Sequence, residues 1–326
     1  MKDISTSEST SSNNIIIGNL ETNKINDVKG TDTSNPNPNP NPKLSHATNN
    51  LIVGDNNTLT GNSTVVVGLS NNATGVSYGG GNGNLQVYGL SNTTKGASSQ
   101  VFGQGNEVYG VYHSVSGYGN NVGKSSDGIS DNRYNVVSGY KNKVEGEHNI
   151  VFGEENEVKT SDNTKPKIDH TVALRYHAKT LGNDAVAIGK ETEANIGSTA
   201  IGGNANATGN YSVALGKESE ASKSYTVAIG KVAKALKSSA VALGDGAKAG
   251  HSNSVALGSD AQTTRSNEVS VGKVGTERYI ANVKTAEKDT DAVNKKQMDD
   301  GDKQIQCKIF HFKFPFLSVK IATLVC

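Results

Sequence analysis

Few residues of this chain combine a type and a spacing that suit catalysis. The segment GYGNNVGKSS, residues 117–126, is the nearest to a phosphate-binding loop. Such a loop needs four residues between its first glycine and the Gly-Lys-Ser group, whereas Gly117 leaves five before Gly123 and Gly119 leaves three. We therefore expect no nucleotide site here. The GGGNG cluster at residues 79–83 is expected to be a flexible loop inside an insertion.

Histidines and carboxylates do not assemble into a recognisable site either. The seven histidines are scattered, and His170 with His177 is the closest pair that we expect to be ordered. No cluster of Cys, Asp or Glu accompanies this pair, so the sequence predicts no metal site. Glu154 and Glu155 lie in a polar turn and are expected to be solvated, not an acid–base pair. We expect no catalysis, no cofactor and no small-molecule substrate.

The composition excludes several classes of protein. The 326 residues include 37 Gly, no Trp and only 34% apolar residues, too few for a large core of big side chains. The net charge of +1 gives no electrostatic case for nucleic acid. No stretch approaches the roughly 20 apolar residues of a membrane helix, and MKDISTSESTSSNN at the N-terminus lacks the apolar region of a secretory signal. The only cysteines are Cys307 and Cys326, and a cysteine-free body fits an exported bacterial surface protein, among others.

A strict internal repeat dominates the chain and must position any functional residue. The phrase Val-Ala-(Leu/Ile)-Gly recurs every 14 residues in SVALGKESEASKSYTVAIGKVAKALKSSAVALGDGAKAGHSNSVALGS, residues 212–259. The series continues in both directions, with one step of 13 residues between its first two glycines. The glycines of this half are Gly189, Gly202, Gly216, Gly230, Gly244, Gly258 and Gly272, and Arg175 replaces the glycine in VALR.

Upstream, the residues of the repeated motif change while the spacing between its glycines persists. Phrases such as LIVG, QVFG and VVSG end at Gly18, Gly54, Gly68, Gly89, Gly103, Gly117, Gly139 and Gly153. Steps of 21 or 22 residues equal one repeat plus an insertion of 7 or 8 residues, near residues 73–83, 122–132 and 158–168. NPNPNPNP, residues 35–42, is typical of an extended polar spacer.

Each repeat has room for two short strands and two turns. The glycine is followed by x-x-(Ala/Ser/Thr)-x-Ala in the C-terminal half and by x-x-Asn-x-(Val/Leu) in the N-terminal half. Fourteen residues are too few for a helical repeat, and no period of 3.6 is present. The sequence therefore predicts an all-β parallel solenoid whose coils bury their faces by stacking. Two other solenoid classes do not fit: acyltransferases use six-residue repeats with a histidine between subunits, and ice or mineral binding needs a ladder of Thr or Asp.

The two strands of a repeat differ in their faces. The second strand alternates polar and small apolar residues, so we expect one buried and one wet face. The first is apolar throughout, as at Val241, Ala242 and Leu243, which indicates burial on both faces. One coil can cover only one of these faces, so another copy of the chain is expected to cover the other. Because the middle position is Ala from Ala173 to Ala256, a close backbone approach is expected to be easiest in that half.

These phrases resemble the head repeats of trimeric autotransporter adhesins, the YadA-like family. NSVALGS, YSVALGK and YTVAIGK are similar to the repeated motif of that head. The resemblance covers residues 50–298 and is most specific between residues 185 and 298. It implies a left-handed parallel β-roll, a homotrimer of three rolls side by side, and a place at the bacterial cell surface, on the cell outer membrane. There the head would bind host matrix protein or a cell-surface ligand, as a virulence factor.

The segment ERYIANVKTAEKDTDAVNKKQM, residues 277–298, resembles the neck that follows such heads. Tyr279 stands where the family has Gln, and Ala286 stands where it has Gly. The resemblance implies a clasp that ties three rolls together and narrows them toward a coiled-coil stalk. The residues that match the neck pattern position for position are Thr290, Asp291, Ala292, Val293, Asn294 and Gln297.

We expect four parts in this chain. Residues 1–50 are a polar segment with a first repeat, 51–276 the head, 277–298 the neck, and 299–326 an aberrant hydrophobic tail whose KIFHFKFPF would expose aromatic rings on one face if extended. The family's signal peptide, stalk and membrane anchor are not expected here.

The expected function is non-catalytic adhesion through the repeated surface of the roll. The insertions are the alternative binding surface, because loops on rigid scaffolds often carry binding. They are expected to loop outward with Tyr78, Lys124, Arg133 and Lys165. The alternative for the whole chain is a truncated adhesin fragment that is not displayed and has no activity of its own.

Overall fold

The computed structural model describes residues 14–19, 21–26, 48–76, 83–123, 132–160 and 168–313, with side chains as far as residue 305. The chain divides into two compact units, Met1–Gly275 and Thr276–Cys326. The first unit contains the repeats. The second contains the segment that resembles a neck.

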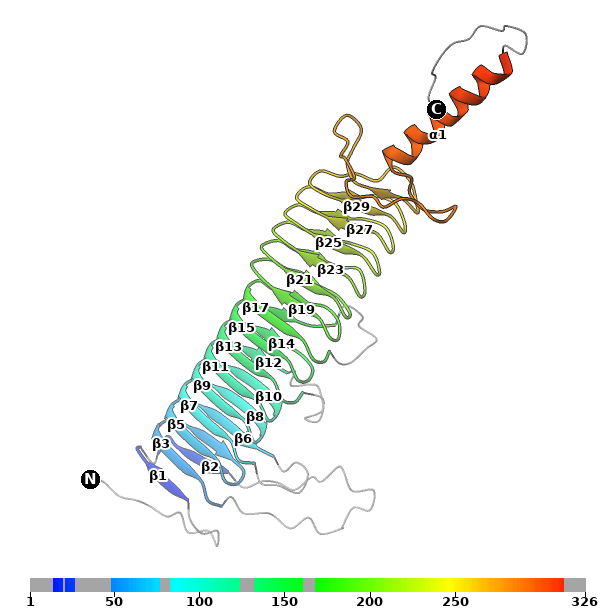
Figure 1. Ribbon diagram of the computed structural model, residues 1–326. Coiled ribbons are helices and arrows are strands. Elements are labelled where there is room, and N and C mark those ends of the chain that lie inside the picture. The colour runs from blue at the N-terminus through cyan, green and yellow to red at the C-terminus, as the bar shows by residue number, and fades with distance from the viewer. Residues whose placement is uncertain are drawn as a thin grey trace, which may run out of the picture. The chain divides into compact units, whose positions relative to one another are not determined.

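The repeats form two parallel sheets whose strands alternate along the chain (Figure 1). Sheet A has 16 strands: β1 Ile15–Ile17, β3 Leu51–Asp55, β5 Val65–Leu69, β7 Gln86–Leu90, β9 Gln100–Gln104, β11 Ser114–Tyr118, β13 Val136–Tyr140, β15 Ile150–Glu154, β17 Val172–Tyr176, β19 Val186–Ile188, β21 Thr199–Ile201, β23 Val213–Leu215, β25 Val227–Ile229, β27 Val241–Leu243, β29 Val255–Leu257 and β30 Val269–Ser270. Sheet B has 14 strands: β2 Lys24–Asn26, β4 Thr58–Thr60, β6 Asn72–Gly75, β8 Thr93–Ala97, β10 Glu107–Val111, β12 Asn121–Val122, β14 Lys143–Val144, β16 Glu157–Val158, β18 Lys179–Thr180, β20 Glu193–Ala194, β22 Asn206–Ala207, β24 Glu220–Ala221, β26 Lys234–Ala235 and β28 Lys248–Ala249.

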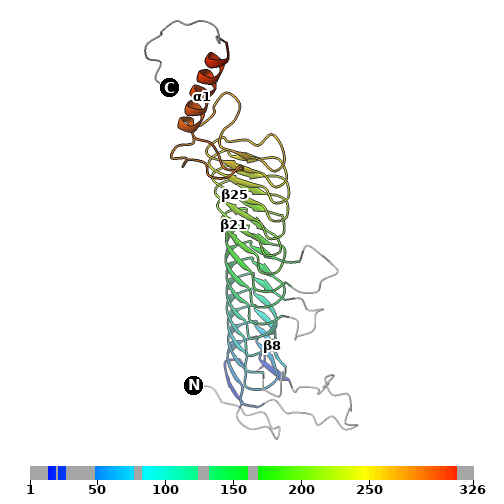
Figure 2. The same cartoon turned by 45° about the vertical axis from the view of Figure 1, so that its right-hand side comes forward.

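Successive repeats pair in register, so the sequence interval becomes a spatial one. Gly54 of β3 pairs with Gly68 of β5, and Ala242 of β27 pairs with Ala256 of β29. Both views show the coils stacked one on the next (Figures 1 and 2). The predicted parallel β-roll with 14-residue coils is confirmed.

Each coil turns at two corners. Corner 1 leads from a strand of sheet A to one of sheet B, and corner 2 leads from sheet B to the next strand of sheet A. Besides Gly54 at corner 1 and Gly61 at corner 2, a non-glycine residue at each of these corners has a positive φ, Asn56 (56°) and Ser63 (54°). Many of these residues are bulky, including Tyr225 (61°) and Val232 (56°). The predicted glycine bend is therefore only part of the turn, because a second residue with positive φ completes it.

The interior of the roll is filled mainly by one apolar side chain from each strand. Up to residue 160 most of these are Val, Ile or Leu, such as Ile52 and Leu59, which are fully buried. From Ala173 onward they are mostly alanines, such as Ala242. The middle residue of the first strand therefore points into its own chain. The expectation that these alanines ease the approach of another copy is wrong, because they line the space between the two sheets of one chain.

A ladder of buried asparagines closes corner 1 in the N-terminal half. Each amide Nδ2 donates to the Oδ1 of the asparagine one coil earlier, over 2.9–3.1 Å. The same Oδ1 also accepts the backbone N–H of the next asparagine, and Nδ2 also donates to a carbonyl of the following coil. Backbone groups at a buried corner need such partners, since water does not reach them. The ladder consists of Asn57, Asn71, Asn92, Asn106, Asn120, Asn142 and Asn156.

The C-terminal half closes the same corner without side-chain amides. The carbonyl of Gly230 accepts the N–H of Ala233, three residues on, at 3.2 Å, and Gly244 with Ala247 repeats this bond at 3.2 Å. The turn is tight enough for the backbone to bond to itself, so the asparagine position holds Ala, Ser or Thr. The alanines here follow from the shape of the turn.

Arg175 marks the change from one half to the other. It takes the position of the repeated glycine with φ 100°, a conformation that costs free energy in a residue with a side chain. Before it, strands of sheet A pair over five residues, as β15 does with β17. After it, β17 pairs with β19 over three residues and pairing ends at Leu174 and Ile188. The ladder of asparagines ends at the same place, where Asn156 Oδ1 accepts the N–H of Ala178 at 2.9 Å.

The second unit contains a helix, α1 Lys295–Lys313. Asn294 caps its start, because Oδ1 accepts the N–H of Gln297 at 3.0 Å. The helix includes Phe310 and Phe312, so the first part of KIFHFKFPF is helical and the shared aromatic face that an extended strand would give does not apply there. The rest of that stretch lies outside the described residues. The helix does not have the length and apolar character that crossing a bilayer requires.

Candidate binding surface

The residues first considered for chemistry are absorbed by the roll. Gly117 is a repeat glycine with φ 114°, paired in sheet A with Gly103 and Gly139. The loop-like segment continues through Gly123, which is described, into residues 124–126, which lie outside the described residues. The cluster at 79–83 also lies outside them, apart from Gly83.

His170 and His177 lie at different corners of their coil. The ring of His170, at corner 2, stacks on His148 with centroids 4.9 Å apart. The ring of His177, at corner 1, stacks on Tyr176 and contacts the carboxylate of Glu155. Within the described residues, no group of three or more His, Cys, Asp or Glu is placed to hold a metal ion.

The outer face of sheet A is mainly apolar. Because the middle residue of each strand points inward, the first and third residues point outward. In the C-terminal half both are aliphatic in nearly every coil, and several remain well exposed: Leu215 by 41%, Ile229 by 37% and Leu257 by 46%. Nearer the N-terminus, Tyr88 and Phe102 stack on this face with centroids 5.0 Å apart. The predicted second apolar face exists, and one chain leaves it uncovered.

The outer face of sheet B is polar, as the alternation predicted. From Glu107 on, its first column includes charged residues of both signs, and some neighbours in adjacent coils attract or hydrogen-bond to each other. Asn121 Nδ2 donates to Glu107 at 3.1 Å, and Lys234 Nζ lies 3.3 Å from the Glu220 carboxylate. Lys248 is exposed on this face while Ala249 beside it is buried. The two sheets of the roll thus present opposite surfaces.

Corner 2 carries a stack of exposed rings that the sequence reasoning missed. Tyr112 stacks on Tyr134 (4.8 Å), Tyr134 on His148 (4.9 Å), and His148 on His170. Farther along, Tyr211 stacks on Tyr225 at 5.7 Å. The signal was present in the sequence, since these residues are one repeat, or one repeat plus an insertion, apart.

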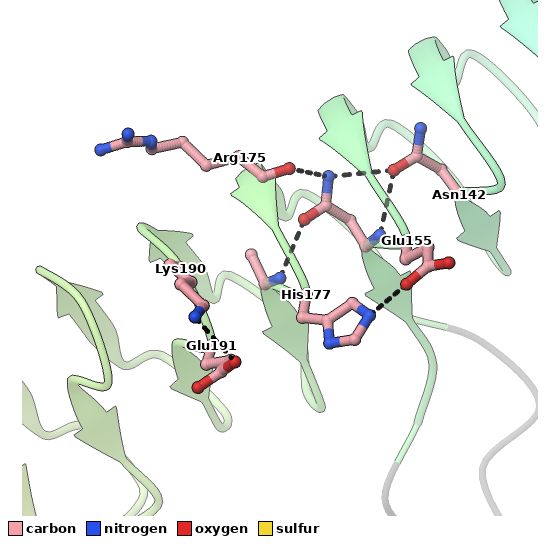
Figure 3. A network of polar contacts seen from close by, with 8 residues as sticks. Asn142, Glu155, Arg175, His177, Lys190 and Glu191 are labelled. Carbon is pink, nitrogen blue, oxygen red and sulfur yellow. Dashed lines mark hydrogen bonds and ion pairs between the residues drawn. The ribbon is translucent and has the colours of Figure 1, made fainter.

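Corner 1 has an open hollow of about 350 Å³ beside the end of the asparagine ladder. Figure 3 shows the polar contacts at this end of the ladder. Asn156 Nδ2 donates there to the carbonyl of Arg175 at 3.1 Å and to Asn142 Oδ1 at 2.9 Å, while the Arg175 guanidinium points away. The charges are mixed and partly paired, so no single sign dominates. The lining residues are Lys141, Lys143, Glu155, Asn156, Glu157, His177 and Lys179.

His113 occupies the buried corner 2 position that Asn135 occupies in the next coil. Its Nδ1 accepts the N–H of Asn135 at 3.2 Å and its Nε2 donates to the carbonyl of Tyr109 at 3.2 Å. The bond accepted at Nδ1 requires the neutral imidazole, because a protonated ring has no acceptor. Burial lowers the pKa of His113 to about 4, against the raising effect of the backbone carbonyls.

The three insertions all enter at corner 2. Residues 77–82, 124–131 and 161–167 follow β6, β12 and β16 and precede the next strand of sheet A. Tyr78, Lys124 and Lys165 lie outside the described residues. Arg133 belongs to the roll instead, since it bridges to Glu147 in register and its Nη2 lies 2.8 Å from that carboxylate. The expectation that Arg133 loops outward is wrong.

The repeat glycines keep coils close together. At Gly216, an added Cβ would lie 2.5 Å from the carbonyl oxygen of Gly230, and φ is 131°. Gly272 differs, because its φ is not positive and its carbonyl accepts the N–H of Gln262 at 2.8 Å. The other repeat glycines of the C-terminal half have φ between 113° and 144°: Gly189, Gly202, Gly216, Gly230, Gly244 and Gly258.

Some of the residues that match a neck tie the second unit together locally. Gln297 accepts the N–H of Ala286 at 2.7 Å and donates to its carbonyl at 3.2 Å. The backbone N–H groups of Glu287 and Lys288 hold the pKa of the Asp291 carboxyl below its usual range. Val293 is 61% exposed. The role of this segment as a clasp between chains stays a prediction.

Comparison with known families now identifies the repeats. Residues 194–219, 212–233, 221–246 and 235–261 match the family model described as YadA head domain repeat. This part of the chain is therefore similar to YadA head domain repeats. The matched residues all belong to the half with the alanine interior. A crystal structure titled as the collagen-binding domain of the Yersinia adhesin YadA is similar at 23% identity and a TM-score of 0.36, covering 56% of this chain and 96% of that one. None of the curated proteins compared with the chain matches it.

Proposed function

We propose that this chain is the head of a homotrimeric, non-enzymatic adhesin of the bacterial cell surface. The observation that carries the proposal is the apolar outer face of sheet A. It continues from coil to coil in register, as at Leu215, Ile229, Leu243 and Leu257. Soluble monomers rarely leave such a large continuous apolar surface in water.

Three copies side by side would cover this face. Closed symmetric assemblies are the usual form of homo-oligomers, and the C-terminal half of the roll offers the same aliphatic stripe to each neighbour. The YadA-type repeats support this arrangement. The exposed Val293 and Ile280 of the second unit support a clasp at residues 277–298.

Sheet B and the corners then remain for ligands. They are polar and charged, and the described hollows on them are open, so we infer binding along a surface and not inside a pocket. We place adhesion on the roll and not on the insertions, because the polar columns repeat in every coil. Host matrix proteins and cell-surface ligands are the proposed partners, and the outer membrane is the proposed location.

Binding to immobilised matrix proteins tests this function. The full chain is compared with a variant in which residues 77–82, 124–131 and 161–167 are each replaced by two glycines. Collagen belongs in the panel, because the similar Yersinia domain is titled collagen-binding. We expect both proteins to bind at least one matrix protein with equal affinity. Loss of binding in the folded variant would assign adhesion to the insertions, and no binding by the full chain would contradict the adhesin function.

A further inference from the structure

A row of basic residues occupies corner 2 near the end of the roll. Four successive coils, from the one with β24 to the one with β29 and β30, each carry one basic side chain at the same position, followed by a serine. In Figure 1 these coils are yellow-green to yellow. The row consists of Lys223-Ser224, Lys237-Ser238, His251-Ser252 and Arg265-Ser266.

Hydrogen bonds between coils fix this row in register. The N–H of Ser239 donates to the carbonyl of Ser224 at 3.2 Å, Asn253 to Ser238 at 3.0 Å, and Asn267 to Ser252 at 3.2 Å. Neighbouring strands in a sheet lie about 4.8 Å apart. The basic groups therefore stand in a straight line, one per coil, with a parallel line of hydroxyl groups beside them.

Charge is less balanced here than elsewhere on the roll. On sheet B the alternation of sign ends at Lys234, which pairs in register with Lys248 of the next coil. Among the described residues, no ion pair engages Lys223, Lys237 or Lys248. The nearby Glu220 lies 3.3 Å from Lys234 Nζ. Glu268 accepts the backbone N–H groups of Thr264 and Arg265, and it offsets part of the charge at that end of the row.

An open hollow of about 460 Å³ lies within the row. It exists because Gly250 has no side chain where the previous coil has Leu236, and nothing lies within 4 Å of a Cβ added there. Thr263 closes its floor and is 7% exposed. No carboxylate lines the hollow, whose residues are Leu236, Lys237, Lys248, Gly250, His251, Gln262 and Thr263.

We propose that this row binds a linear sulfated polysaccharide, with one sulfated sugar seated in the hollow at Gly250. Ammonium and guanidinium groups make strong charge-assisted hydrogen bonds to oxyanions. The serine hydroxyls can bond to sugar hydroxyls or to sulfate oxygens. A straight row of single charges fits an extended chain that carries anionic groups at regular intervals.

Single-stranded nucleic acid fits this row less well. Proteins that bind it place aromatic platforms between their cations so that the bases stack. No Phe, Tyr or Trp occurs between Tyr225 and Tyr279, so bases would find no platform along most of the row. The proposal rests on the adhesin function for its biological meaning, while the site itself depends only on one roll.

Heparin, a highly sulfated polysaccharide, is the probe. Its affinity is measured by calorimetry for the full chain and for the triple variant Lys223→Ser, Lys237→Ser and Arg265→Ser. The matched control removes equal charge from corner 1 through Lys190→Ser, Lys217→Ser and Lys231→Ser, all exposed in the structure. We expect the first variant to lose more than about tenfold in affinity, the equivalent of one strong charge-assisted bond, and the control to lose less than about twofold.

Gly250→Leu fills the hollow without changing any charge. We expect it to fold normally, because a Cβ there meets nothing, and to weaken heparin binding by at least about threefold through loss of the sugar seat. Equal losses in both triple variants would overturn the proposal, since binding would then follow net charge alone. Equal affinity for a single-stranded oligonucleotide would also overturn it. Heparin binding without any matrix adhesion would contradict the adhesin function while supporting the site.

Discussion

The two halves of the roll build the same coil with different chemistry. Up to residue 160, asparagine amides hydrogen-bond from coil to coil at corner 1 and bulky aliphatic side chains fill the interior. From Ala173 on, alanines fill most of the interior. From Gly202 on, the glycine carbonyls bond to the backbone of their own turn. Corner 2 differs as well. The position that the basic row occupies in the second half is Gly96, Gly110 and Gly146 in the first half.

This comparison shows that a solenoid corner has a fixed hydrogen-bonding requirement and more than one way to meet it. Where the turn is wide, a buried side chain must donate to the backbone carbonyl at the corner. Asparagine can do this and also accept from the next coil, because its amide has both a donor and an acceptor. Where the turn is tight, the backbone bonds to itself and the side chain is free to be small. We expect the first half to depend on individual side chains more strongly than the second.

The largest effect should come from a charge inside the roll. Ala242→Asp places a carboxylate at a fully buried position between the sheets, where an unpaired charge costs more than about 4 kcal/mol. We expect the coils around residue 242 to unfold, because each coil is stable only through its neighbours. Loss of strand signal in circular dichroism and a lower melting temperature measure this. Lys248→Asp, on the wet face of the next strand, is the control, with a change below roughly 0.5 kcal/mol. Equal shifts would contradict the assignment of faces.

Breaking the asparagine ladder should have the next largest effect. Asn120→Ala removes bonds to Asn106, Ser116 and Gly139 and leaves the amide and the N–H of Asn142 without their acceptor. Unsatisfied buried groups cost about 1–3 kcal/mol each, so we expect a loss of about 3 kcal/mol in the free energy of unfolding.

Ser219 has the same position in the other half and serves as the matched control for Asn120. Its hydroxyl donates only to Gly216 at 2.9 Å, and the neighbouring coils have Ala205 and Ala233 at this place. Ser219→Ala should therefore cost less than about 1 kcal/mol. Similar losses for both variants in chemical denaturation would remove the difference between the halves.

Acid should weaken the first half through His113. Its pKa falls from the usual 6.5 to about 4 on folding, so the unfolded chain binds a proton that the folded chain does not. The stabilising contribution is complete above pH 6.5 and is lost as pH falls toward 4, which amounts to about 2 kcal/mol between pH 7 and pH 5. His113→Asn introduces the residue that the next coil has at this position, and it should remove most of this pH dependence of the free energy of unfolding. An unchanged pH profile of unfolding would show that His113 is not its source.

Much of the fold was predictable because the repeat imposes it. The glycine interval gave the strands, their parallel register and the 14-residue coil, since each phrase has to stack on the same phrase. The face assignment was half right. Val241 and Leu243 point outward as the second apolar face requires, but Ala242 fills the interior of its own chain, and apolar succession alone does not say which residue points inward.

Other features depend on geometry that residue types do not reveal. The recurring asparagine was visible in the sequence. Its role could not be predicted, because it depends on the distance between the corners of successive coils. Positive φ at Tyr225 and Val232 goes against their usual preference and follows from closing the coil. The exposed rings and the basic row recur in the sequence at the repeat interval. Only the structure shows that they line up on the same corner and form surfaces. Arg133 looked like part of an insertion because the register resumes one residue before it.

The mass of the full chain in solution tests the account's central claim, that the apolar outer face of sheet A joins three copies. At micromolar concentration under reducing conditions, we expect light scattering to give three times the 34.0 kDa of one chain. Leu243→Asp places a charge on that face without entering the interior, so it should give a folded monomer. A mass of 34.0 kDa for the unaltered chain would contradict the account.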